Sequence, residues 1–142
     1  MINNSEHFST FVLPQIKALQ EKGFYFISFI MMVQAIEYLG GLMDNKPLKA
    51  REQSKKRFNK AISTLFGSGY KVLNRNDELY NDLRNPLLHT LNQGSKFILL
   101  SENNSEKHKH FQIIENKTVL IAEEMYHDIT VAFSKLKRSH KE

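Results

Sequence analysis

A stretch of twenty residues, FYFISFIMMVQAIEYLGGLM (24–43), is apolar almost all round and constrains the fold more than any other part of the sequence. A helix with no polar face has to be surrounded, either by other elements or by lipid. Gln34 and Glu37 interrupt the stretch, and its longest apolar run is about ten residues, shorter than the ~20 that a membrane span requires. We therefore expect the central helix of a soluble protein.

Glu37 is the only carboxylate in this stretch, and two interpretations of it stay open. A buried carboxylate without a partner is costly. Glu37 therefore either pairs with a structural partner or faces water in a functional site.

The other apolar patterns predict a bundle closed by a small sheet. Helical spacing covers residues 5–21, 48–66 and the stretch from Ala122 onward, and a further helix is expected after Asn76 as its N-cap. Pro14 either kinks the first helix or lies in its first turn. KFILL (96–100) and HFQII (110–114) predict a hairpin, and TVLI (118–121) adds an optional third strand. The expected fold is mainly α: a bundle of about five helices with a small antiparallel β-hairpin or three-stranded sheet (about 96–121) inserted before the last helix, in one domain over residues 1–142.

Charge is concentrated in one segment. The chain carries a net charge of +5, yet residues 46–60 hold seven cations and a single acid, Glu52. Such a cluster is either an electrostatic footprint for a polyanion such as RNA or a solvated helix face. The candidate RNA-binding residues are Lys49, Arg51, Lys55, Lys56, Arg57 and Lys60.

Several function classes find no support. There is no cysteine, which excludes disulfides and thiolate metal sites. The sequence contains neither GxGxxG nor GxxxxGK[ST], the two common phosphate-binding glycine motifs. His108 and His110 form the pattern HKH, but without a carboxylate motif we interpret them as surface histidines and expect no metal and no cofactor. No signal peptide is visible at the start, so the expected location is cytoplasmic.

The stretch LRNPLLH (83–89) places Arg84 and His89 on either side of an Asn-Pro pair. On a straight helix, residues five apart diverge by about 140°. Pro86 disrupts a straight helix, and two geometries are compatible with it. One is a kinked continuous helix. In the other, Asn85 caps a new helix whose free N–H groups point back towards Arg84, in an arrangement suited to phosphate.

The motif LRNPLLH resembles the Arg-Asn-x-x-x-His motif of the HEPN superfamily, and the preceding apolar helix with an embedded acid fits the same pattern. Members of that superfamily are small helical bundles, many of them metal-independent ribonucleases of toxin–antitoxin, phage-defence or RNA-processing systems. The resemblance implies that Arg84 binds phosphate, that His89 performs acid/base catalysis, that Asn85 is the polar residue after the arginine, and that Glu37 orients the site. His-x-Tyr, common in toxin members, is replaced here by His89, Thr90 and Leu91.

The resemblance also implies partners. HEPN-like proteins typically dimerise with their motifs facing one cleft, so we expect a two-fold homodimer that acts on RNA. A companion antitoxin or nucleotidyltransferase is a further expected partner, and no membrane is expected. The alternative is a non-catalytic RNA- or nucleotide-binding regulatory protein, in which Arg84 pairs with Glu37 or Asp82 for structural reasons.

Overall fold

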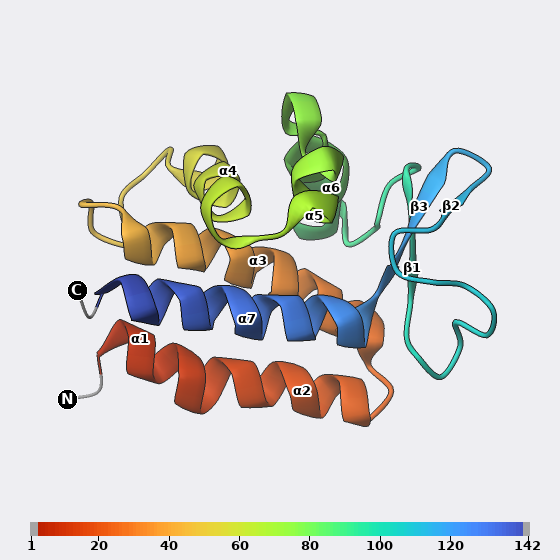
Figure 1. Cartoon of the computed structure of the whole chain (residues 1–142), viewed down its shortest axis with the longest axis horizontal. Coiled ribbons are helices and arrows are strands. Elements are labelled where there is room, and N and C mark those ends of the chain that lie inside the picture. The colour runs from red at the N-terminus through yellow and green to blue at the C-terminus, as the bar shows by residue number, and fades with distance from the viewer. Residues whose placement is uncertain (1–2, 141–142) are drawn as a thin grey trace.

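The computed structural model describes residues 3–140 and shows a helical bundle with a small sheet at one end (Figure 1). The mainly α fold with a small sheet before the last helix is therefore confirmed. The helices are α1 (Asn4–His7), α2 (Leu13–Glu21), α3 (Tyr25–Met43), α4 (Ser54–Leu65), α5 (Ser68–Leu73), α6 (Asn85–Thr90) and α7 (Ala122–His140), with π-helical segments η1 (Phe8–Val12) and η3 (Tyr80–Arg84) and a 3-10 turn η2 (Arg75–Asp77). The strands are β1 (Phe97–Leu100), β2 (Ile113–Ile114) and β3 (Lys117–Ile121).

Helix α3 lies at the centre of the bundle, as its sequence predicts. Helices α2 and α7 pack along one side of it, and α4 and α6 lie on the other (Figure 1). The side chains of Phe29, Val33, Ile36 and Leu39 are completely buried. Burial of a side chain of this size stabilises the fold by about 1.5–3 kcal/mol, so α3 organises the core.

By length and composition, α3 is the one helix among residues 3–140 that is apolar enough to cross a membrane. Half of its most apolar window is buried inside the fold. Its exposed face carries a short apolar stripe, Phe24, Ile27 and Met31.

Both helical prolines follow a π-helical segment. The backbone N–H of Leu13 donates to the carbonyl of Phe8, and that of Asn85 donates to the carbonyl of Tyr80. Each bond spans five residues instead of four and ends one residue before a proline, Pro14 or Pro86. The wider turn accommodates the proline, which has no N–H to donate. Both helices therefore continue past their prolines.

The expected hairpin between residues 96–100 and 110–114 is wrong. Strand β1 instead pairs in parallel with β3, in register from Phe97 with Thr118 to Leu100 with Ile121. The hairpin joins β2 to β3 through Glu115 and Asn116, both at positive φ. That two-residue turn suits the twist of a tight antiparallel hairpin.

The helix cap assigned to Asn76 is also wrong. Asn76 lies in the 3-10 turn at φ 54°, and the side chain of Asn74 receives the N–H of Tyr80 instead (3.1 Å). An additional short helix, α5, precedes this turn, between the two helices expected over residues 48–66 and after Asn76.

Candidate functional site

A buried ion pair joins the motif to the central helix. Arg84, at the end of η3, donates to Glu37 Oε1 on α3 through Nη2 (2.8 Å) and Nε (3.1 Å). The two side chains are 10% and 15% exposed. At this burial the pair is screened little by solvent, so each charge depends on the other.

Further polar groups surround this pair. Ser54, the first residue of α4, donates to Glu37 Oε1 (2.9 Å) and lies 2.6 Å from the hydroxyl of Tyr80. Arg84 Nη1 donates to Asn85 Oδ1 (3.0 Å), and its guanidinium lies 5.1 Å from the centre of the Tyr80 ring. The cluster thus connects α3, α4 and the motif helix, with three of the five N–H donors of Arg84 in use.

The sequence positions this cluster through a stripe of leucines. Leu79, Leu83 and Leu87 follow one another at intervals of four and are completely buried. They hold η3 and α6 against the core. Arg84 directly follows Leu83 and therefore lies at the edge of the buried face, beside Glu37.

His89 lies in a different environment from Arg84. It is exposed in the last turn of α6, and its imidazole makes no hydrogen bond within the described residues 3–140. Leu91, in the left-handed conformation at φ 55°, ends the helix just beyond it. A free imidazole at the surface is accessible to a substrate or to a second copy of the chain.

The structure corrects the phosphate-binding geometry considered for Asn85. Arg84 and Asn85 both have helical backbone angles, and the N–H of Asn85 is bonded to Tyr80. Of the two expected geometries, the motif thus adopts the continuous helix. Although α6 is counted from Asn85, this residue does not cap a separate helix. Glu37, Arg84 and Asn85 are brought together, whereas His89 stands apart on the surface.

The basic segment divides into two groups. Lys49, Arg51, Lys55, Lys56 and Lys60 are exposed, and Lys55 pairs with Asp77 (3.1 Å). Arg57, expected among the RNA-binding residues, is only 6% exposed and is corrected to an internal anchor.

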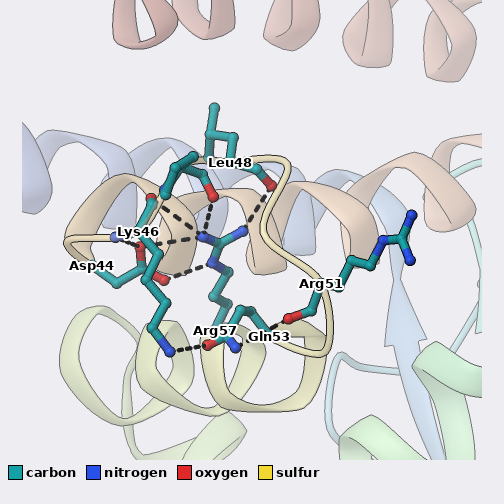
Figure 2. A network of polar contacts seen from close by, with 7 residues as sticks. Asp44, Lys46, Leu48, Arg51, Gln53 and Arg57 are labelled. Atoms are coloured by element: carbon teal, nitrogen blue, oxygen red, sulfur yellow. Dashed lines mark hydrogen bonds and ion pairs between the residues drawn. The ribbon is translucent and has the colours of Figure 1, made fainter.

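Figure 2 shows why Arg57 is held inside. Its Nε donates to Asp44 Oδ2 (2.6 Å), and its Nη atoms donate to the carbonyls of Leu48 (2.9 Å) and Pro47 (2.8 Å). The hydrogen bond from Arg57 holds the pKa of the Asp44 carboxyl below its usual value. The Arg51 side chain extends away from this network. The guanidinium of Arg57 therefore fastens the loop after α3, whereas that of Arg51 makes no hydrogen bond or ion pair within residues 3–140.

A second buried polar cluster was not anticipated. The hydroxyl of Tyr70 on α5 donates to Asp128 on α7 (2.6 Å) and lies 3.0 Å from His110 Nε2, while His110 Nδ1 accepts the N–H of Ile121 (2.9 Å). His110 is therefore not a surface histidine, and it is separated in role from His108, which is exposed. Burial and the Asp128 carboxylate raise the pKa of Tyr70 above its usual value. The three residues come from distant segments, so no local pattern in the sequence could have revealed them.

Within the part of the chain that the structure describes, no three His, Asp or Glu side chains are arranged to hold a metal ion. The motif region itself offers an arginine held by a carboxylate, an amide and an accessible imidazole.

Comparison of the chain with protein-family models, with curated proteins and with solved structures gave no match.

Proposed function

We propose that this protein acts on RNA as a metal-independent endoribonuclease of HEPN type, in the cytoplasm and as a two-fold dimer. One observation carries the proposal: Glu37 holds Arg84, which in turn donates to Asn85, while His89, on the same helix, is exposed and makes no hydrogen bond within residues 3–140. This supports the two roles that the motif implies, a positioned cation and a free acid/base group. Because His89 stands apart from Arg84 within one chain, their joint action on one phosphate depends on the dimer.

The reaction suited to these groups uses the RNA's own 2′-hydroxyl. Its oxygen attacks the adjacent phosphorus, and an imidazole accepts its proton, a transfer for which the near-neutral pKa of histidine is suited. The P–O5′ bond breaks, and a second, protonated imidazole gives the leaving oxygen its proton. The remaining N–H groups of Arg84 stabilise the charge that develops on the phosphorane. The products are a 2′,3′-cyclic phosphate and a 5′-hydroxyl.

Two proton transfers on opposite sides of one phosphate require two acid/base groups, and the motif of one chain supplies only His89. A two-fold axis beside α6 would bring the His89 residues of two copies to one cleft, because such an axis repeats the same patch on both subunits. The exposed apolar residue Leu91, next to this turn, adds to the surface available for such a contact.

A second candidate function rests on a different observation. Arg84 already has a buried carboxylate partner, which is also what a non-catalytic, RNA- or nucleotide-binding regulatory protein requires for its fold alone. Such a protein would shift RNA in a salt-sensitive manner without cutting it. An antitoxin or nucleotidyltransferase as companion protein is compatible with both functions.

The test compares RNA cleavage in EDTA by the wild type and His89→Ala, with His127→Ala as the matched control. Both histidines are exposed, so neither substitution disturbs the core. Loss of general acid/base catalysis should slow His89→Ala by about 10²–10⁴-fold, and His127→Ala should cleave at the wild-type rate. Equal rates for the two variants would remove His89 from the site, and binding without cleavage by the wild type would favour the second function.

A further inference from the structure

A basic groove lies between the end of α3, α4 and α5. Its volume is about 760 Å³. Four lysines line it: Lys46 in the loop after α3, Lys56 and Lys60 one turn apart on α4, and Lys71 on α5. Lys71 is distant in sequence from the basic segment, so only the fold places it with the others.

The acids at the groove are already neutralised. Asp44 is paired with Arg57 (2.6 Å) and Asp77 with Lys55 (3.1 Å). None of the four lining lysines has a carboxylate of residues 3–140 within ion-pair distance. The groove therefore carries an excess of four positive charges.

The polar side chains of the wall are also satisfied. Asn74 donates to Asn59 (2.7 Å), Asn59 donates to Asp77 (2.8 Å), and Asn74 accepts the N–H of Tyr80 (3.1 Å). This chain of bonds makes a fixed wall with few free donors. The ammonium groups of Lys56, Lys60 and Lys71 make no hydrogen bond within the described chain. That of Lys46 donates once, to Gln53 Oε1 (3.1 Å), and keeps two of its three N–H groups. These four ammonium groups are the ones left to bind a ligand.

The spacing of two of these lysines lowers the stability of α4. Lys56 and Lys60 lie one turn apart on the same face of α4, where like charges repel and destabilise the helix. A bound polyanion reverses the sign of that interaction, because each phosphate attracts both ammonium groups.

The lining contains no aromatic side chain. Proteins that hold single-stranded nucleic acid by its bases use aromatic rings as stacking platforms. Lysine ammonium groups contact phosphates as point charges and carry no base information. A ligand in this groove is thus recognised by its phosphates and not by its bases.

We propose that the groove formed by Lys46, Lys56, Lys60 and Lys71 binds the sugar-phosphate backbone of a single-stranded polynucleotide without base preference. This deepens the proposed action on RNA by assigning the track on which the strand lies. Among the residues expected to contact RNA, Lys71 takes the place of Arg57, which is buried.

The test measures the anisotropy of labelled oligothymidylate in EDTA over a salt series. This ligand has no 2′-hydroxyl and stays intact whether or not the protein is a nuclease. Four phosphate contacts on a single strand predict a slope of log K against log salt of about −3. The variant Lys56→Gln/Lys60→Gln should halve that slope. The control, Lys107→Gln/Lys117→Gln, makes the same change in net charge at exposed residues away from the groove and should keep the wild-type slope.

Competition identifies the chemistry. Inorganic polyphosphate should displace the oligothymidylate, and oligodeoxyadenylate should bind with the same affinity. Equal losses in the two double variants, a preference for one base, or displacement by polyglutamate as efficient as by polyphosphate would each overturn the proposal; the last would indicate an acidic protein. Groove binding with no RNA cleavage would overturn the nuclease alone. Cleavage that depends on His89, with unchanged slopes in the groove variant, would overturn the groove alone.

Discussion

Arg84 Nη2 lies 2.8 Å from Glu37 Oε1, and this contact ties together two residues that are 47 positions apart in the sequence. The same carboxylate oxygen accepts a bond from Ser54 on α4. One acid therefore fastens the motif helix and α4 to the central helix. The pair supports the fold as well as any chemistry, so the effects of its removal on stability and on activity have to be measured separately.

Replacing Arg84 by Ala should destabilise the protein by about 3 kcal/mol, because removing one partner leaves Glu37 charged and without its arginine in a buried position. Urea unfolding followed by circular dichroism measures the change. Arg75→Ala serves as control, since Arg75 is exposed and such surface changes fall within about 0.5 kcal/mol.

The double replacement Arg84→Met/Glu37→Leu should regain most of the stability lost in Arg84→Ala, because apolar groups of similar size need no partner. If Arg84→Ala and Arg75→Ala unfold at the same urea concentration, the buried pair does not contribute as described.

Gly40 is required for the close approach of α3 and α4. A Cβ at this position would collide with the backbone carbonyl of Arg57. A Cβ at Gly41 would be too close to one atom, Leu48 Cδ2 at 2.8 Å, on a side chain that can rotate, and would touch Arg57 Cδ and Nε at an ordinary 3.5 Å. Both substitutions to Ala gain the same helix propensity. Gly40→Ala should therefore be less stable than Gly41→Ala by about 1–3 kcal/mol, and equal melting temperatures would contradict this packing.

Asp128 makes stability depend on pH. Burial raises the pKa of Asp128, but His110, whose Nε2 lies 3.6 Å away, and the hydrogen bond from Tyr70 outweigh it and lower the pKa below the usual value. A lowered pKa in the folded state means that the stabilisation is complete above the unfolded value of about 4 and is lost as the pH falls through the folded value.

The stability advantage of the wild type over Asp128→Asn should therefore be largest at neutral pH and shrink on acidification below about pH 4. Urea unfolding at several pH values measures it, with Glu21→Gln as a control at an exposed carboxylate. If the advantage of the wild type grew on acidification, the result would contradict a lowered pKa of Asp128 in the folded state.

The helical core could be predicted because its signal is local. Residues 24–43 are apolar all round, and the stripes of α4 and α7 repeat at helical spacing, so burial follows from periodicity. The sheet could not be predicted in the same way. Both β1 and the strand-forming residues near Ile113 favour extended structure, but the pairing of β1 with β3 is a tertiary choice that no local pattern shows.

The candidate site was predictable in its residues and not in its geometry. Glu37 and Arg84 stand out as an acid in an apolar helix and an arginine before Asn-Pro. The π-helical turn that lets Asn85 continue the helix is not encoded by a residue pattern that spacing rules detect, and the same holds for η1 before Pro14. Arg57 resembles its basic neighbours in sequence, and only the loop of residues 44–48 folding over it separates it from them.

The most direct measurement of the central claim is the chemistry of the RNA ends produced in EDTA by the wild-type protein. Attack by the 2′-hydroxyl predicts a 2′,3′-cyclic phosphate on one fragment and a 5′-hydroxyl on the other, both formed about 10²–10⁴-fold more slowly by His89→Ala. Fragments that carry a 5′-phosphate and a 3′-hydroxyl, or RNA that stays intact with the wild type, would contradict the proposed ribonuclease.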